Sequence, residues 1–239
     1  MTELVFREDA YARECEARVV ACTPEGVVLD RTVFYYESGG QPGDTGVLAL
    51  DDGRLLAVSD ARRGAAVEGG VSVLHKFVEP AAAALAPGTR VTARIDWDRR
   101  HRLMRMHTCL HLLSAVIIAP VTGGQVGDGY GRLDFDLPDN IDAADVEAKL
   151  NALIARKAEV SGRWISDAEL DAHPELVKTM SVAPPRGVGR VRLIEVAGID
   201  LQPCGGTHVA NSQEIGRVIV AKVEKKGSKN RRVRLEFAP

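Results

Sequence analysis

The sequence lacks any hydrophobic run long enough to span a membrane. Its longest apolar stretch, from Leu110 to Pro120, has the length of a buried helix, whereas a membrane-spanning helix needs about 18 or more apolar residues. The N-terminal segment MTELVFREDA also lacks the basic-then-apolar pattern of a secretion signal. We therefore expect a cytoplasmic protein without a membrane partner.

Cysteine is scarce as well, because the chain has only four. This number excludes a disulfide scaffold, and in a reducing compartment the thiols are expected to be free or to bind a metal. Apolar residues nevertheless make up 45% of the 239 residues. That share excludes a disordered chain and is enough to bury the core of one large domain or two small ones.

No charge of one sign dominates, since the formal net charge is −2. The charges are unevenly distributed, however: residues 1–90 carry 9 basic and 14 acidic side chains, whereas residues 91–239 carry 22 and 19. The stretch from Lys222 to Arg234 contains seven basic residues and one acidic residue. A polyanion is expected to bind this second part, although an exposed edge strand whose charges prevent aggregation would explain the same stretch.

Turn signals rich in glycine and proline divide the first 90 residues into short segments typical of β-strands. The predicted strands are Ala17–Ala21, Gly26–Asp30, Thr32–Tyr36, Val47–Leu50, Leu55–Ser59 and Val71–Phe77. Many short strands at this spacing predict a small β-barrel domain over residues 1–90.

Helical signals follow in residues 91–239. The predicted helices run from Arg99 to about Ile118, over about residues 141–154, and onward from Ser166. Asp98 is expected to cap the first of them, and Ser166 with Glu169 has the spacing of a capping box. Further strands are predicted at Arg90–Asp96, Arg132–Phe135, Arg190–Val196, Arg217–Val223 and Arg231–Phe237. The expected fold class is thus α+β, an N-terminal barrel followed by a domain with helices packed on an antiparallel sheet.

One short motif occurs twice, as SGGQPGDTG at residues 38–46 and as TGGQVGDG at residues 122–129. We predict both copies to be loops. Glycine pairs in such loops let main-chain N–H groups approach a ligand closely. Two loops with the same backbone requirements and no ligand would explain the repeat equally well.

Two pairs of candidate metal ligands stand out, each with a spacing of four residues. The motif HTCLH at 107–111 places His107 and His111 on one face of the first predicted helix. The motif CGGTH at 204–208 supplies Cys204 and His208, and its two glycines predict a tight loop. One cysteine with three histidines fits Zn²⁺ better than Mg²⁺ or Ca²⁺.

The combination of HTCLH with CGGTH resembles the editing domain of alanyl-tRNA synthetase and, more closely, the freestanding alanyl-tRNA editing (AlaX) proteins. The segments FYYESGGQPGDTG at 34–46, GGQVGDGYGRLDFDL at 123–137 and NRRVRLEF at 230–237 resemble this family too. The resemblance implies a zinc-dependent aminoacyl-tRNA deacylase that acts in trans. Its substrate would be tRNA(Ala) misacylated chiefly with serine, or with glycine. A zinc ion, one per chain, would either lower the pKa of a water molecule or position the ester.

The resemblance also implies roles for single residues. The zinc ligands would be His107, His111, Cys204 and His208. Gln125 would lie with Cys204 at the scissile ester, and Thr32 would hydrogen-bond to the serine hydroxyl. Gly39, Gly40 and Gln41 would line the other wall of the site. The acceptor stem of the tRNA is expected to contact Arg99, Arg102, Lys225, Lys226, Lys229 and Arg231.

Other functions are compatible with the same residues. Four protein ligands make a closed zinc site, which is typical of an RNA-binding module with a structural ion and no hydrolytic activity. The GGQ tripeptides could act without metal, by analogy with peptide release factors. A metal hydrolase acting on a small-molecule ester would not need the basic stretch. A monomer is the favoured oligomeric state.

Overall fold

The computed structural model of the chain describes residues 1–65, 70–78, 85–180 and 189–239. These residues form two compact units. The first comprises Met1–Ser38 and Pro42–His101, and the second comprises Gly39–Gln41 and Arg102–Pro239. The predicted boundary after residue 90 falls one strand earlier than this division. Within the described ranges, no helix has both the length and the apolar character needed to cross a membrane.

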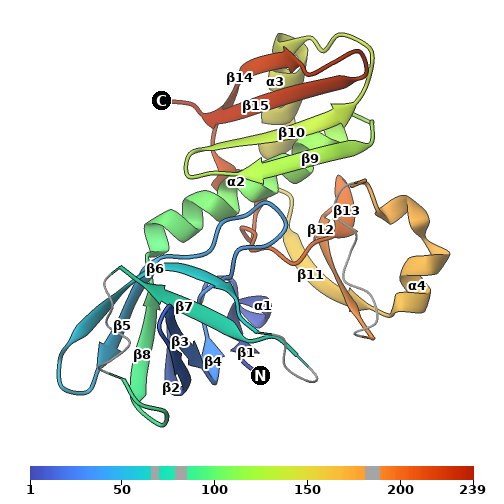
Figure 1. Ribbon diagram of the computed structural model, residues 1–239. Coiled ribbons are helices and arrows are strands. Elements are labelled where there is room, and N and C mark those ends of the chain that lie inside the picture. The colour runs from blue at the N-terminus through green and yellow to red at the C-terminus, as the bar shows by residue number, and fades with distance from the viewer. Residues whose placement is uncertain (66–69, 79–84, 181–188) are drawn as a thin grey trace. The chain divides into compact units, whose positions relative to one another are not determined.

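Six strands of the first unit close into an antiparallel barrel (Figure 1). In pairing order they are β2 (Glu14–Thr23), β3 (Gly26–Leu29), β7 (Val73–Phe77), β6 (Leu55–Arg63), β5 (Gly46–Leu50) and β8 (Arg90–Ile95). A one-turn helix, α1 (Val5–Glu8), and the paired short strands β1 (Glu3–Leu4) and β4 (Arg31–Thr32) belong to the same unit. The predicted N-terminal barrel is therefore confirmed.

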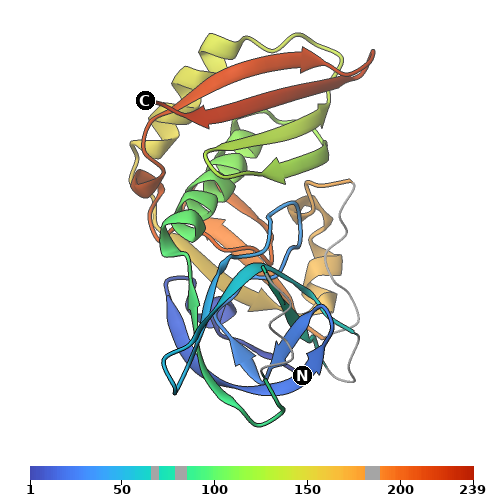
Figure 2. The same cartoon turned by 60° about the vertical axis from the view of Figure 1, so that its left-hand side comes forward.

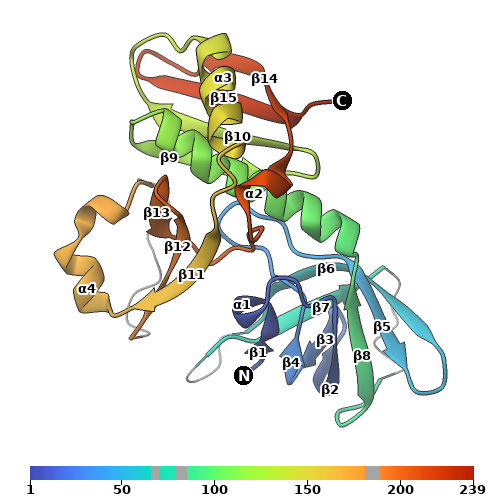
Figure 3. The same cartoon turned by 180° about the vertical axis from the view of Figure 1, so that it is seen from behind.

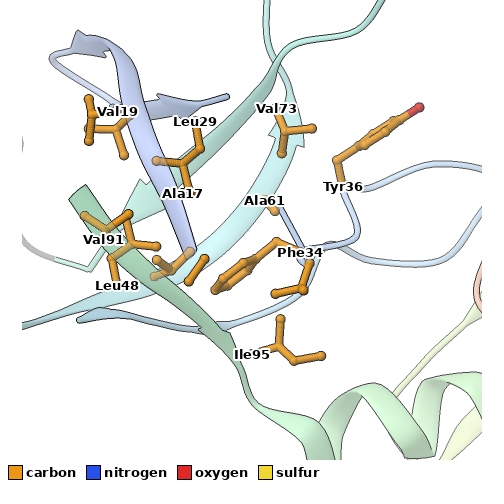
Figure 4. Packing of buried hydrophobic residues seen from close by; sticks show 14 of the residues in the cluster. Ala17, Val19, Leu29, Phe34, Tyr36, Leu48, Ala61, Val73, Val91 and Ile95 are labelled. Atoms are coloured by element: carbon orange, nitrogen blue, oxygen red, sulfur yellow. The ribbon is translucent and has the colours of Figure 1, made fainter. Parts of the chain in front are cut away.

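Apolar side chains from successive strands fill the barrel. Figure 4 shows Leu29, Leu48 and Val91 pointing into a common interior, together with Phe34. The predicted strand Thr32–Tyr36 is wrong beyond Thr32, although residues 33–36 are all buried. Two of their backbone N–H groups use side-chain acceptors instead of a neighbouring strand: Thr32 Oγ1 accepts from the Phe34 N–H at 3.0 Å, and Asp44 accepts from the Tyr35 N–H.

A buried ion pair fixes this irregular segment. Arg100 is fully buried and donates to both carboxylate oxygens of Asp44 and to the carbonyl of Val33. Asp44 Oδ2 also accepts from the Tyr35 N–H at 2.6 Å. Asp44 belongs to the first copy of the repeated motif, so one end of that motif is bound to the barrel core.

Arg100 lies in the first turn of α2, which spans Trp97–Val116. The helix begins two residues earlier than predicted. Asp96 is its capping residue rather than Asp98, because Asp96 Oδ1 accepts from the Arg99 N–H at 3.1 Å. The helix ends close to the position that Pro120 predicts.

His75 on β7 is a polar group inside the barrel and is fully buried. Its Nδ1 lies 3.2 Å from the carbonyl oxygen of Val27, and its Nε2 lies 2.7 Å from Thr32 Oγ1. Because a carbonyl only accepts, we assign the proton to Nδ1, and Nε2 then accepts from the Thr32 hydroxyl. Burial lowers the pKa of His75 from 6.5 to about 4.

This burial predicts that the barrel unit loses stability in acid. Between pH 6.5 and 4 the unfolded chain protonates His75 while the folded chain does not, so the free energy of unfolding should fall as the pH decreases. The contribution of His75 is about 3 kcal/mol at 1.4 kcal/mol per pH unit. Urea unfolding followed at Trp97 in a Trp164→Phe background measures it, because Trp97 belongs to the first unit and Trp164 to the second. Glutamine does not titrate, so between pH 6.5 and 4 the His75→Gln variant should lose less stability than wild type by this amount. Equal pH dependences of the two proteins would contradict the prediction.

The second unit combines two antiparallel sheets with helices. The larger sheet has the order β14 (Val218–Lys225), β15 (Asn230–Phe237), β10 (Tyr130–Asp136) and β9 (Val121–Val126). The smaller sheet consists of β11 (Val160–Ile165), β12 (Val191–Val196) and β13 (Asp200–Pro203). Besides the larger part of α2, the described residues of the second unit form α3 (Ala143–Ile154), α4 (Asp167–Ala172), and the 3₁₀ turns η2 (Pro174–Leu176) and η3 (Ser212–Ile215). The predicted α+β class is confirmed.

Helix α3 lies against the larger sheet and protects its edge (Figure 3). The side chains of Glu147 and Asn151 accept from the backbone N–H groups of Val220 and Val218 on the edge strand β14. The predicted capping box of α4 is present, because Ser166 and Glu169 exchange hydrogen bonds between side chain and backbone.

The prediction of a loop at the second GGQ tripeptide is wrong. Residues 121–126 form β9, in which Gly124 is paired with Leu133 and Gln125 with Arg132 of β10. The absence of side chains suits this strand, because a Cβ on Gly124 would lie 3.0 Å from the Leu133 side chain. Strands β11 and β13 were not predicted either.

Candidate metal centre and its surroundings

Four side chains from two separate segments of the second unit bring metal-binding atoms together. His107 and His111 lie one turn apart on α2, while Cys204 and His208 belong to the loop that follows β13. Their ligand atoms all lie within 4.8 Å of one another, and Cys204 Sγ is 3.3 Å from Nε2 of His208. Ligand atoms around a tetrahedral zinc ion are about 3.5 Å apart, given bond lengths of about 2.0–2.3 Å. The four residues therefore fit a zinc ion.

Two of the three imidazoles are oriented by uncharged groups. His107 Nδ1 lies 2.8 Å from Gln41 Oε1, and His208 Nδ1 lies 3.1 Å from Thr108 Oγ1. Thr108 donates its own hydroxyl hydrogen to the carbonyl of Met104 at 3.0 Å, so its oxygen accepts from His208. A proton on Nδ1 leaves the lone pair of Nε2 available to a metal.

The third imidazole is oriented by a carboxylate. His111 Nδ1 lies 3.0 Å from Oδ2 of Asp200, which is itself buried on β13. Lys178 pairs with the other oxygen of Asp200, and Gln202 Nε2 donates to Oδ2 at 2.8 Å. A carboxylate behind a histidine is a common arrangement around protein-bound zinc, because it fixes the ring and raises its basicity.

The electrostatics of the site favour the thiolate form of Cys204, which is the form that binds a metal cation. Burial opposes ionisation of the Cys204 thiol, but the imidazoles of His107 and His208 outweigh it and hold its pKa well below the usual range. Burial lowers the pKa of His208 to about 3. For His111 the effect of burial is outweighed by the Asp200 carboxylate, and its pKa is raised to about 9. Thiolate and neutral imidazole are the forms that bind zinc, so metal competes with a proton at His111.

The loop that carries Cys204 and His208 is tight, as its glycines predict. A Cβ on Gly206 would lie 2.2 Å from Cε1 of His107, so a larger residue there would displace the ring. Arg192 holds the loop from behind by donating to the carbonyl of Gly206 at 2.8 Å.

The two copies of the repeated motif meet beside this loop. Gly40, at a φ of +82°, accepts from the Val126 N–H at 2.8 Å, and a Cβ on Gly40 would lie 2.8 Å from the carbonyl oxygen of Gly124. Gly39 is exposed, whereas Gln41 is fully buried. Gln125 is exposed on β9, and its Oε1 lies 3.3 Å from Nε of Arg132. Since one glutamine is buried and the other lies on a strand, metal-free hydrolysis by exposed GGQ loops is disfavoured.

Thr32, the predicted contact of a serine hydroxyl, belongs to the first unit. It is fully buried, and its hydroxyl is engaged by His75 and by the Phe34 N–H. The four metal-binding residues belong to the second unit, so the contact of Thr32 with a serine hydroxyl stays a prediction.

The basic residues predicted to contact tRNA differ in exposure. Arg231 is buried and donates to the carbonyls of Pro138 and Asp139, so its guanidinium is not available to a phosphate. Arg99 donates to a backbone carbonyl of the first unit, and Arg102 forms an exposed ion pair with Asp128. Lys225, Lys226 and Lys229 are exposed at the turn of the β14–β15 hairpin, drawn in red in Figure 2.

Sequence reasoning missed the groups behind the histidines, namely Thr108 and Asp200. No spacing rule connects them to the ligands they orient, although Asp200 lies on the same strand face as Gln202, just ahead of the CGGTH motif. Cys109, which lies between His107 and His111 on α2, is not part of the metal-binding group. It is buried, and burial raises its pKa to about 12.

Comparison with known proteins gives consistent matches along the chain. Residues 6–99 match the family model for class II (A) tRNA synthetases, and residues 191–234 match the second additional domain of threonyl and alanyl tRNA synthetases. The chain is 40% identical to the alanyl-tRNA editing protein AlaX-M of Methanosarcina barkeri, over 98% of both chains. It is 34% identical to the AlaX-M protein of Saccharolobus solfataricus over 100% of both. An alanine–tRNA ligase of Thermococcus kodakarensis is 31% identical over 94% of this chain and 24% of the ligase.

Proposed function

We propose, from the premise that this chain belongs to the family of alanyl-tRNA editing proteins of the AlaX-M type, that it hydrolyses the ester between a wrong amino acid and the 3′ end of tRNA(Ala). Serine is the proposed main substrate and glycine the second. The observation that carries the proposal is the convergence of one cysteine and three oriented histidines on one centre. Editing of this kind is needed because a synthetase site built for a methyl group cannot strongly reject an added hydroxyl.

His107, His111, Cys204 and His208 would hold one zinc ion per chain. The ion would supply a Lewis acid that polarises the ester carbonyl or lowers the pKa of a nearby water molecule. The Cys204 thiolate would cancel one of its two positive charges. Among the four ligands Cys204 is half-buried and the histidines are buried, so we place the approach of the ester on the Cys204 side.

Gln125 is the proposed hydrogen-bond donor to the ester. Its Oε1 accepts from Nε of Arg132, which can only donate. The Nε2 group of Gln125 is therefore the end that would donate to the ester. An exposed amide N–H is suited to stabilise the negative charge that develops on the carbonyl oxygen when water attacks. Thr32 is not included in this proposal, because its hydroxyl is engaged inside the barrel.

The direct test is deacylation of seryl-tRNA(Ala) and alanyl-tRNA(Ala) by the purified full-length chain loaded with zinc. Loss of serine with sparing of alanine is the expected result, and glycyl-tRNA(Ala) tests the second substrate. If serine stays on the tRNA while the protein binds zinc, the deacylase proposal fails.

A structural zinc in an RNA-binding module is the second candidate function, and the ligand set itself favours it. Four protein ligands complete a tetrahedron and leave no position for a substrate. This candidate predicts tRNA binding and zinc-dependent folding without hydrolysis. The same assay, combined with a tRNA binding measurement, separates the two.

The hairpin lysines Lys225, Lys226 and Lys229 are the proposed contacts of the tRNA backbone. All three are exposed, and the stretch around them has a strong excess of positive charge. Backbone contacts of this kind give affinity without sequence preference, because the phosphates are the same for every base.

Replacing all three lysines with alanine is expected to weaken tRNA binding about tenfold and to reduce the slope of log K against log salt concentration by about 2. Filter binding at several salt concentrations measures both quantities. Lys149→Ala on α3, where the lysine is exposed and paired with Asp145, is the control and should keep the wild-type slope. An unchanged slope in the triple variant would place the tRNA on another surface.

A further inference from the structure

We propose that Gln41 is a positioning residue of the metal centre, which sets the tautomer of His107 and ties its ring to the loop of Cys204 and His208. This inference rests on the zinc site proposed above. It differs from the sequence-based expectation, in which Gln41 lines the wall of the substrate site.

The amide of Gln41 is completely enclosed by groups of the metal centre. Its Oε1 lies 2.8 Å from Nδ1 of His107 and 3.2 Å from the backbone nitrogen of Thr207. Its Nε2 donates to Thr207 Oγ1 at 2.9 Å. Both Gln41 and Thr207 have an exposed fraction of 0%, so neither polar end of the amide is available to a substrate.

These contacts determine where the proton of His107 lies. The backbone N–H of Thr207 can only donate, so the amide atom that it faces must be the oxygen of Gln41. The same oxygen faces Nδ1 of His107, which must therefore carry a hydrogen. With Nδ1 protonated, Nε2 has a free lone pair, and it lies 3.5 Å from Cys204 Sγ. Thr207 thus orients Gln41, and Gln41 orients the ring of a ligand.

The glycines on both sides make room for this contact. A Cβ on Gly206 would lie 2.5 Å from Nδ1 of His107 and 3.0 Å from Oε1 of Gln41, which are the two atoms that meet. On the other side, the carbonyl of Gly40 is held by the Val126 N–H. The GGQ tripeptide at 39–41 and the CGGTH motif therefore serve one structural purpose, the placement of the His107 ring.

The role predicts a selective loss of zinc affinity. Gln41→Met keeps the length of the side chain but removes the acceptor, and we expect zinc to bind about 10- to 100-fold more weakly. Gln41→Glu keeps an oxygen that can accept from His107 and from the Thr207 N–H, and the Thr207 hydroxyl can rotate to donate to the second carboxylate oxygen. The zinc affinity of this variant should therefore stay within about threefold of wild type. Gln125→Met changes the equivalent glutamine of the second motif. Gln125 contacts Arg132 rather than a metal-binding residue, so this variant should bind zinc like wild type.

Competition with a chromogenic chelator measures the zinc affinity of the full-length variants, and circular dichroism checks that each is folded. Equal zinc affinity of Gln41→Met and wild type would overturn the proposal, as would equal losses in Gln41→Met and Gln41→Glu. A change in serine-over-alanine selectivity with unchanged zinc affinity would instead assign Gln41 to the substrate wall.

A measurement on the wild type keeps the proposal testable if Gln41→Met does not fold. Imidazole ¹⁵N chemical shifts of the zinc-loaded protein should show His107 protonated at Nδ1 and metal-bound at Nε2, and the opposite tautomer would overturn the role of Gln41. Failure of the wild type to bind zinc at all would remove the centre itself. If the wild type does not deacylate seryl-tRNA(Ala) but has the expected zinc affinity and His107 tautomer, the proposed function fails and this inference stands.

Discussion

Replacing Cys204 with alanine is expected to abolish stoichiometric zinc binding and to slow seryl-tRNA(Ala) deacylation by at least about 100-fold. The thiolate is the one anionic ligand of the four, and its loss leaves three neutral imidazoles. Zinc content after dialysis and single-turnover deacylation measure the two effects.

Cys109→Ala is the matched control, because Cys109 lies on α2 between two ligands but is buried outside the metal-binding group. It should keep one zinc ion per chain. Wild-type deacylation by a Cys204→Ala protein that has lost zinc would show that the ion is not needed for hydrolysis. Retention of zinc by this variant would remove Cys204 from the ligands.

The second large effect concerns the barrel rather than the metal centre. Asp44→Ala leaves the fully buried guanidinium of Arg100 without its counter-ion and the Tyr35 N–H without its acceptor. Removing one partner of a buried pair costs about 3–5 kcal/mol, because the other charge stays desolvated. We expect the free energy of unfolding of the barrel unit to fall by this amount, as measured by urea unfolding followed at Trp97 in the Trp164→Phe background.

Two further variants test the cause. Asp44→Ala combined with Arg100→Met removes both charges and should recover part of the loss, because no unpaired ion is left. Asp51→Ala breaks the exposed pair between Arg90 and Asp51 and should cost less than about 1 kcal/mol. A loss below about 1 kcal/mol in Asp44→Ala would contradict the importance of the buried pair.

The sequence determined those features whose signals are local. Histidines four residues apart share a helix face, so HTCLH predicts two ligands before any tertiary contact is known. Turn signals between short apolar segments predicted the barrel, and the Ser166 capping box predicted the start of α4. In each case the residues that give the signal are close neighbours in the chain.

Strand predictions failed in two segments where contacts with side chains, rather than the local sequence pattern, determine the backbone conformation. Residues 33–36 have the apolar pattern of a strand, but the side chains of Thr32 and Asp44 accept the hydrogen bonds of the Phe34 and Tyr35 N–H groups. The glycines of β9 are typical of a turn, yet they suit a strand on which a side chain packs closely. No signal in the sequence separates the basic residues of β15 from one another. Arg231 is buried and Arg234 is exposed because successive side chains of the strand point to opposite faces of the sheet, and only one face is covered.

The tertiary structure alone decided what orients the three histidines. Their partners Gln41, Asp200 and Thr108 lie 66, 89 and 100 residues away along the chain. Hydrogen bonds between such distant groups follow no periodicity, because they depend on which loops meet after the core has packed. The sequence by itself therefore determined the four candidate ligands and the chemistry they favour, whereas the direction of each imidazole depended on contacts that exist only in the folded chain.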